Sequence, residues 1–336
     1  MKKFFLPAFI SFLLIGLFSC NKDKRYEPKT TDKSINVRII RFDRDFLHLN
    51  QKNIVQSTRN LYKKYPEIIN IYTNEILGVS ATDTSGVANL FSEFLTDSVF
   101  AGVNQKTLQV FDDVTSIEKS LSASFSILHS FFPEIKLPEV FFYVSGFNRS
   151  VLVGSNTIGV GADLFLGSDY QRYQNFTYQY LIKNMTPQQI TPVVMSTVLY
   201  NNFPFGESNE RLIDNMLYRG KMMFLLSKLM PEELPNTIIG YEKREWEWCR
   251  KYEKQVWETI MDRNDLFSTD MTLIHKYMDE APFTTPVSQE APGRLGTWVG
   301  WQIIESYMKN NKSVSLKDLM LNKNYQQIFE NSGYKP

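Results

Sequence analysis

The thiol of Cys20 is the side chain whose surroundings indicate a defined covalent chemistry. Two lysines near the start of the chain precede an apolar stretch over residues 4–18, and Ser19 and Cys20 follow it directly. This is the order of a bacterial lipoprotein signal, in which a small residue precedes the cleavage site and the cysteine receives a diacylglycerol. The stretch is shorter than the roughly 20 residues that span a bilayer, so the lipid would be the anchor. The sequence therefore predicts a cleaved signal peptide over residues 1–19 and lipid attachment at Cys20.

The residues after Cys20 and the overall charge limit where the protein acts and what it binds. Residues 20–34 have almost no apolar side chain to bury, which predicts a lipidated cysteine on a flexible tether. Asn21 favours delivery to the outer membrane, so we expect a lipid-anchored cell-envelope protein on the periplasmic face of that membrane. The 37 Lys and Arg residues against 36 Asp and Glu give no field that favours nucleic acid. The expected partners are the membrane, through the lipid, and other envelope proteins.

Side chains that carry most enzymatic chemistry are few and scattered. The three histidines, His48, His129 and His275, are isolated, and the sequence has no His-Glu-x-x-His or His-x-His motif. It has no Gly-x-Ser-x-Gly elbow either, and Cys249 lies in an apolar and aromatic stretch that favours an inert thiol. We therefore expect no metal, no cofactor and no enzymatic activity.

Asp163 is the acidic residue in the most unusual position, because it lies among Gly159, Gly161 and Gly167. These glycines form no phosphate loop, since no helix-opening Gly-Lys-Ser follows them, and they favour close backbone packing or a sharp turn. An isolated acid in such a place either caps a turn or serves as a carboxylate in a cleft, and capping is the commoner use. Asp163 is accordingly a candidate cleft residue with a structural alternative.

The stretch over residues 292–309 predicts a helix with two unusual glycines. Leu295, Val299, Ile303 and Tyr307 form one apolar stripe, while Gly296 and Gly300 clear the neighbouring face for another backbone. A glycine inside a helix is unfavourable by roughly 1 kcal/mol, so close packing or a partner should compensate. A buried central helix is the interpretation we favour, and a partner-binding face is the alternative.

Three further residues of this helix are candidates for a partner or a cleft. Arg294 lies in the first turn, where a cation opposes the helix dipole, so we expect it to have a specific acidic contact. Trp298 and Trp301 add large aromatic surfaces to the same helix.

The elements that must position these residues follow from hydrophobic periodicity. Alternation over residues 35–42 predicts a first strand, and short β-branched or aromatic runs over residues 138–161 predict an antiparallel β-meander. Thr115 and Glu118 fit a capping box. Apolar residues three and four apart predict helices over residues 53–65, 66–77, 86–95, 115–132, 192–200, 209–230, 239–263, 270–278, 292–309, 316–321 and 325–332. The prediction is one α+β domain over residues 35–336, mostly α-helical, with a C-terminal helical part from about residue 186.

Several stretches together carry a resemblance to a known family. They are the lipobox, residues 161–167, 219–223, 248–250, 281–283, 292–302 and 332–336. The most specific is Pro-Gly-Arg-x-Gly-x-Trp-x-Gly-Trp-Gln within residues 292–302. With these stretches the chain resembles the gliding motility lipoprotein GldB family. The resemblance implies a cell-envelope lipoprotein that is a non-catalytic component or partner of the gliding motility or type IX secretion machinery.

The order of elements is also similar to that of zincin-type peptidases. In those proteins a helix after the sheet carries His-Glu-x-x-His, and a later Glu-Gly pair supplies the third ligand. Here the corresponding stretches are residues 194–199, which contain no ligand, and Arg219-Gly220, where the arginine would repel a cation. This resemblance implies a zincin-like scaffold without its metal motif, with Arg219 as a candidate cleft residue. The alternative function is a zincin-like or other envelope hydrolase that acts on peptide or glycan.

Overall fold

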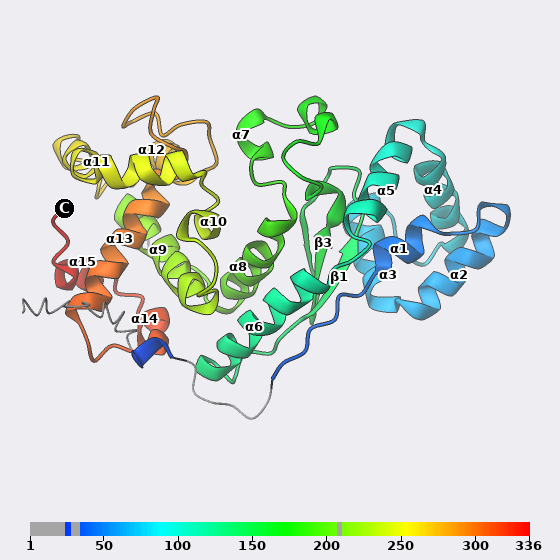
Figure 1. The fold of residues 1–336 in the computed structure, drawn as a ribbon, viewed down its shortest axis with the longest axis horizontal. Helices are drawn as coiled ribbons and strands as arrows, with labels where there is room; N and C mark the ends of the chain where they lie inside the picture. The colour runs from blue at the N-terminus through cyan, green and yellow to red at the C-terminus, as the bar shows by residue number, and fades with distance from the viewer. Residues whose placement is uncertain (1–23, 28–33, 207–209) are drawn as a thin grey trace, which may run out of the picture.

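The computed structural model describes residues 24–27, 34–206 and 210–336 (Figure 1). The predicted signal peptide, Cys20 and most of the predicted tether lie outside these residues. Within the described ranges, no helix is both long enough and apolar enough to cross a membrane.

The N-terminal helices gather at one end of the molecule in Figure 1. They are α1 (Phe42–Leu47), α2 (Ile54–Lys64), α3 (Pro66–Tyr72), α4 (Thr84–Thr96) and α5 (Ser98–Val110), with a π-helical turn over Thr73–Leu77 after α3. The sequence periodicity predicts all but the first and last of these helices, with a single helix over residues 66–77. The next helix, α6 (Thr115–Phe131), runs along the middle of the molecule toward the other end.

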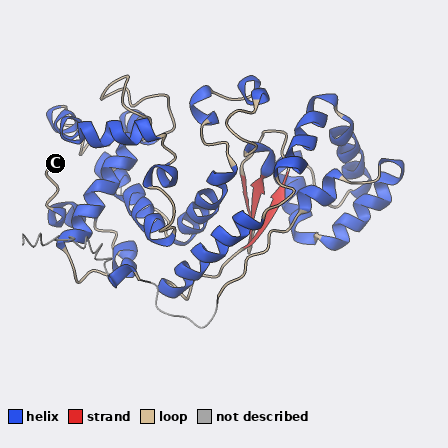
Figure 2. Cartoon of the chain, viewed as in Figure 1, coloured by secondary structure: helices blue, strands red, loops and turns tan. Residues whose placement is uncertain are grey.

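In the described residues of the C-terminal half, all regular secondary structure is helical and long loops join the helices, as Figure 2 shows. Its helices are α7 (Gln179–Ile182), α8 (Ile190–Asn202), α9 (Leu212–Leu229), α10 (Pro235–Ile239), α11 (Lys243–Asp262), α12 (Met271–Met278), α13 (Leu295–Asn310), α14 (Leu316–Leu321) and α15 (Tyr325–Ser332). Short 3-10 turns cover Lys24–Tyr26, Gln51–Asn53, Ala162–Leu164, Gln171–Asn175 and Pro187–Gln189. The single helix predicted over residues 239–263 is wrong, because Gly240 adopts a positive φ of 74° and ends α10 before α11 begins.

The sheet has three strands, β1 (Glu139–Tyr143), β2 (Val151–Val153) and β3 (Thr157–Gly161), in the order β1-β3-β2. β3 pairs antiparallel with β2 and parallel with β1. The predicted antiparallel meander is therefore wrong, because β3 inserts between the two earlier strands instead of extending them. The mostly helical α+β class is confirmed, whereas the zincin-like scaffold is not supported.

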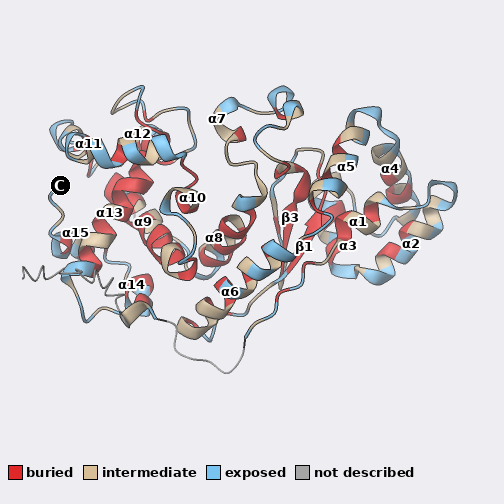
Figure 3. Ribbon diagram, in the orientation of Figure 1, coloured by how far each residue is buried: buried red, intermediate tan, exposed pale blue. Residues whose placement is uncertain are grey.

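Strands β1 and β3 are buried on both faces, whereas the edge strand β2 is partly exposed (Figure 3). On β1, Phe141 and Tyr143 pack with Phe42, Phe46 and Tyr72 of the N-terminal helices, and the Tyr72 ring meets the rings of Phe42 and Tyr143 edge to face. Val140 and Phe142 point the other way, into the large core shared with α6 and α8. The alternation along one strand thus joins the two helical parts of the molecule through a single sheet.

The glycines near Asp163 allow close packing, as the sequence predicts. A β-carbon at Gly159 would lie 2.4 Å from the Phe141 ring, and one at Gly161 would lie 2.4 Å from the Arg149 carbonyl oxygen. No side chain fits at either position. These glycines are therefore needed for the close packing of the sheet.

The segment before α1 is extended, but it pairs with a helix. The backbone N–H groups of alternate residues donate to side chains one turn apart on α6: Ile35 to Ser126 Oγ (3.1 Å), Val37 to Ser122 Oγ (2.9 Å) and Ile39 to Glu118 Oε1 (2.9 Å). Two extended residues rise about 6.7 Å and four helical residues about 6.0 Å, so the two spacings nearly match. The first strand predicted over residues 35–42 is wrong, since a single bridge at Ile40 joins this segment to the sheet.

The same contacts explain why the predicted capping box is absent. α6 begins at Thr115 with Val114 as its N-cap, and the valine side chain has no oxygen atom that could accept a capping hydrogen bond. The Glu118 carboxylate instead accepts the Ile39 N–H and forms an ion pair with Arg38 at 2.8 Å.

Helices α9 and α13 cross with their backbones in contact at two glycines. A β-carbon at Gly300 would lie 1.8 Å from the Met216 carbonyl oxygen, and one at Gly220 would lie 2.3 Å from the Gly300 carbonyl carbon. The two backbones therefore touch directly, and Gly296 meets the end of α12 at Tyr277 and Met278. The favoured interpretation of this helix, a buried central one, is confirmed: Leu295, Val299 and Ile303 are all buried.

We predict that Gly300→Ala destabilises the protein by about 1–3 kcal/mol or more, because its methyl group forces two backbones apart. The control is Gly102→Ala in α5, where the nearest atom is the end of the flexible Arg172 side chain at 3.1 Å. There the helix should gain up to about 1 kcal/mol. Denaturant unfolding of both variants measures the difference, and equal stability of the two would contradict the packing at Gly300.

Candidate functional site

One face of α8 is left open by its neighbours. Val193, Ser196, Thr197 and Tyr200 recur at the i, i+3, i+4, i+7 spacing and are half-buried, while Val194 and Val198 are buried in the core. This face forms the floor of a groove, which we call the α8 cleft.

Two cavities of about 330 Å³ each open along the α8 cleft. They share Asn184 and Val193 in their linings, so they are neighbouring parts of one groove. One part is mostly apolar and includes Phe147 and Phe176, whose rings lie 4.8 Å apart. The other also has apolar residues in its lining, such as Met223 and Ile239, but it adds polar ones, and we call it the polar part: Gln189, Ser196, Thr197, Tyr200, Glu280 and Arg294. A cleft with one apolar and one polar part suits a chain segment that carries both kinds of side chain.

Arg294 lines the polar part of the cleft. Its Nε lies 3.0 Å from Glu280 Oε1, and its Nη2 donates to the Ile239 carbonyl at the end of α10. The acidic contact predicted for this residue is therefore confirmed. Arg294 has a φ of 59°, a left-handed conformation that few non-glycine residues adopt. Behind it, the Tyr241 hydroxyl donates to the Gly293 carbonyl at 2.8 Å and fixes the turn that enters α13.

Arg219 lies near the α8 cleft but is held by α12. Its Nη1 donates to the Met278 carbonyl at 2.6 Å, and its Nη2 lies 3.6 Å from Asp279 Oδ1. Burial raises the pKa of the Tyr200 hydroxyl, and the positive charges of Arg219 and Arg294 oppose that rise. The two arginines therefore both act electrostatically on the floor of the cleft, although Arg219 is not part of its lining.

Asp163 is a buried cap and lines neither cavity of the α8 cleft. Its carboxylate accepts the backbone N–H groups of Ser145 (3.0 Å) and Phe147 (2.7 Å) and the Ser145 hydroxyl. Burial raises its pKa, and these hydrogen bonds to the ionised form oppose the rise. Asp163 therefore has the structural, capping role. Its hydrogen bonds fix the loop after β1, and this loop places Phe147 in the apolar part of the cleft.

The two tryptophan candidates are core residues. Trp298 is 0% exposed and Trp301 is 3% exposed, and both pack against Trp246 of α11. Their prediction as partner or cleft residues is wrong, because α11 covers the side of α13 that carries them. The sequence pattern showed large aromatics but not which neighbour covers them.

Sequence reasoning missed the residues that form the open face of α8. In the sequence, this face is a set of small, hydroxyl-bearing and aromatic residues at helical spacing, interleaved with aliphatic residues. Because the helix is apolar on most sides, its sequence does not show which face lacks a neighbouring element. Among the described residues that line the two cavities, none is a histidine or a cysteine, and Glu280 is the one carboxylate. No group of three or more His, Cys, Asp or Glu side chains within the described ranges could hold a metal ion.

The contacts of Lys221 were also not predicted from the sequence. Its ammonium group is buried and donates to the carbonyls of Leu319 (3.2 Å), Met320 (3.3 Å) and Asn322 (2.8 Å) at the end of α14. It also lies 4.9 Å from the centre of the Tyr325 ring. Burial, with a smaller contribution from Lys323, lowers its pKa from 10.5 to about 8.

The fold and the cleft define a mostly helical α+β protein with a mixed apolar and polar groove. The chain matches the family model of the gliding motility protein GldB over residues 23–336, and it belongs to that family. It is thus a lipoprotein-family protein related to gliding motility. No curated protein and no solved structure matches the chain.

We predict that Lys221 makes stability rise with pH in the alkaline range. Its pKa is about 8 in the folded protein and 10.5 as an ordinary lysine, so the unfolded chain holds more protons between these values. Between pH 7.5 and 9.5 the parent should gain roughly 2 kcal/mol relative to Lys221→Met. Urea unfolding of both proteins at each pH measures this, and parallel pH profiles would show that Lys221 is charged over the whole range.

Proposed function

We propose that this protein is a lipid-anchored envelope component that binds a segment of a partner protein in its α8 cleft and catalyses no reaction. The partner belongs to the gliding motility or type IX secretion machinery. Membership of the gliding motility family supports an envelope partner in general. The observation that carries the rest is the α8 cleft itself, with its apolar and polar parts in one groove.

The chemistry of the cleft favours binding. Asn184 and Gln189 already donate to the Gly240 and Thr237 carbonyls, so the wall of the polar part is held in one shape. A preformed groove loses little conformational entropy when a segment enters it. Apolar side chains would enter beside Phe147 and Phe176, and polar groups would meet Ser196, Thr197 and Tyr200.

The same residues give little support to hydrolysis. A nucleophilic hydroxyl needs a base within hydrogen-bond reach, and the Thr197 hydroxyl donates instead to the Val193 carbonyl of its own helix at 2.8 Å. The carboxylate in the described lining, Glu280, is bound to Arg294. Glycoside hydrolysis ordinarily uses two carboxylates that flank the bond. The proposal of a non-catalytic role rests on these arrangements.

The anchor in this proposal is the lipid on Cys20, on the periplasmic face of the outer membrane. The order of basic, apolar and small residues before Cys20 supports lipidation, and Asn21 supports the outer membrane.

We expect Thr197→Trp to block the polar part of the cleft, because the indole would fill part of the cavity that Thr197 lines. A photo-crosslinking amino acid at Val193 in intact cells should form a discrete adduct with a partner, and Thr197→Trp should lower its yield about tenfold or more, as loss of roughly 1.4 kcal/mol of binding implies. Asn201→Trp is the matched control, since Asn201 is exposed on the same helix outside both cavities. Equal adduct yields in the two variants would remove the cleft from the proposal.

We expect Cys20→Ala to yield an unlipidated and mostly unprocessed precursor, because thiol lipidation precedes cleavage in this pathway. Metabolic labelling with a fatty acid, followed by purification of the protein, measures the modification. A Cys20→Ala protein that still carries labelled fatty acid would place the anchor elsewhere.

A further inference from the structure

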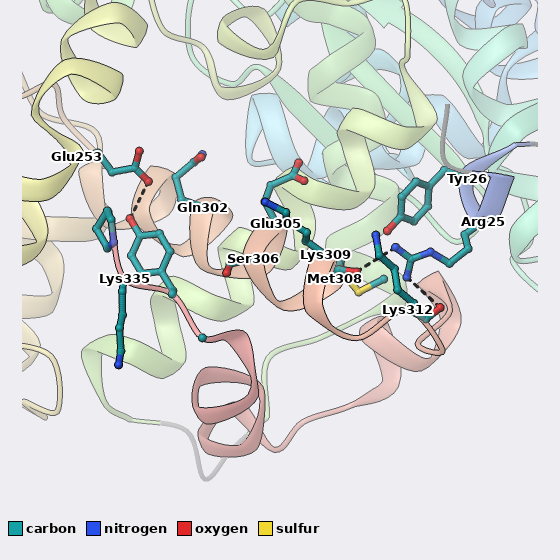
Figure 4. Close-up of a pocket in the computed structure, with 13 residues that line it drawn as sticks. Arg25, Tyr26, Glu253, Gln302, Glu305, Ser306, Met308, Lys309, Lys312 and Lys335 are labelled. Carbon is teal, nitrogen blue, oxygen red and sulfur yellow. Dashed lines mark hydrogen bonds between the residues drawn. The ribbon is translucent and has the colours of Figure 1, made fainter. Parts of the chain in front are cut away.

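The segment just after the predicted lipid site is attached to the body of the protein. Lys24–Tyr26 forms a 3-10 turn, and the Arg25 guanidinium donates to carbonyls at the C-terminal end of α13, as Figure 4 shows. The acceptors are Met308 (3.0 Å), Lys312 (3.3 Å), Val314 (3.3 Å) and Asn311 (3.4 Å). A cation at this position is also favoured by the helix dipole. At these residues the chain is therefore docked, where its composition alone predicts a flexible tether.

Tyr26 secures the same turn by packing. Its ring meets Phe224 of α9 edge to face, with 5.6 Å between ring centres. The Lys228 ammonium lies 5.0 Å from the Tyr26 ring centre and 3.7 Å from Glu305. Arg25 and Tyr26 thus hold one point of the N-terminal segment against both α9 and α13.

The docking shortens the connection to the lipid. The chain takes five Cα–Cα steps from Cys20 to Arg25, and five extended steps span at most about 18 Å. If the segment were free as far as Ser34, fourteen such steps would allow about 50 Å. The covalent reach therefore limits how far the C-terminal end of α13 can lie from the lipid, and only a small part of the protein surface satisfies that limit.

We propose that the surface around the C-terminal end of α13 faces the bilayer and contacts the phosphate headgroups of its lipids. This proposal rests on the lipidation of Cys20 proposed above. The surface includes a groove of about 510 Å³ between the docked turn and the C-terminal residues 333–336. Lys309, Lys312 and Lys335 have exposed side chains at its rim, which suits headgroup phosphates.

The carboxylates of the groove are bound by the protein itself. Glu253 accepts the Tyr334 hydroxyl at 2.9 Å, and Glu305 accepts the Trp301 indole N–H at 3.2 Å in addition to its ion pair with Lys228. Their negative charge is thus partly offset within the fold. Lys309 and Lys335 are exposed at the rim, where a bilayer held within reach of Arg25 would meet them.

The test uses the lipidated full chain in vesicles of phosphatidylethanolamine and phosphatidylglycerol that contain a nitroxide-headgroup lipid. A fluorophore is attached at Lys335→Cys in one sample and at Lys52→Cys in another, since Lys52 is exposed beside α2 at the opposite end of the molecule. Cys249 is buried and does not compete for the label. We expect quenching at position 335 to be at least about twofold stronger than at position 52, because a nitroxide quenches only fluorophores close to it and position 335 lies on the surface proposed to contact the headgroups.

The variant Arg25→Ala with Tyr26→Ala should reduce this difference while the protein stays bound to vesicles through its lipid. Arg38→Ala is the matched control, because Arg38 is an exposed arginine near the N-terminus that pairs with Glu118 and not with α13. Equal quenching at both positions in the parent, or a difference that the double variant leaves unchanged, would overturn the assignment of this surface. A parent chain that fails to float with vesicles would instead overturn lipidation at Cys20, and the surface assignment with it.

Discussion

The direct contact of two helix backbones, at Gly220 of α9 and Gly300 of α13, determines where most other parts of the C-terminal half can lie. The neighbours of Gly220 on α9 each reach another helix: Arg219 donates to the end of α12, and Lys221 donates to the end of α14. If α13 moved outward to admit a side chain, it would displace α12, which packs on it at Gly296, and α14, which follows it in the chain, and their carbonyls would move away from these donors. Three consecutive residues of one helix therefore fix three other helices, which is only possible because the middle residue has no side chain.

The cations of this protein repeatedly serve the ends of helices. Arg25, Arg219, Lys221 and Arg294 donate to carbonyls at or just beyond the C-terminal ends of α13, α12, α14 and α10. These carbonyls have no partner within their own helices, and a positive charge there also complements the helix dipole. The near-neutral composition thus conceals a consistent internal use of positive charge. It also explains why a basic residue in a conspicuous sequence motif does not by itself indicate a binding site.

Local patterns in the sequence predicted most of what is local in the structure. Helices with apolar residues three and four apart were found, and so were the packing roles of Gly159 and Gly300. Most of the errors concern partners that lie far away in the chain, whereas the helix predicted over residues 239–263 failed locally, at Gly240. The order β1-β3-β2 depends on the pairing of β3 with β1 as well as with its sequence neighbour β2. In the same way, the backbones of Ile35, Val37 and Ile39 donate hydrogen bonds to side chains of α6 about 80 to 90 residues later. Trp298 was ambiguous for the same reason, since only the position of α11 decides that it is buried.

The two ends of α13 give the molecule a direction. Arg294 begins this helix at the wall of the α8 cleft, and Arg25 docks at its other end, next to the proposed lipid anchor. A helix of 16 residues rises about 24 Å, so the cleft wall and the docked turn are separated by roughly that distance. With the Arg25 end against the bilayer, α13 holds the cleft away from the headgroups, where a protein segment can approach it. If the docked turn were released, the lipid would still retain the protein, but the cleft could turn toward the membrane and be covered by it.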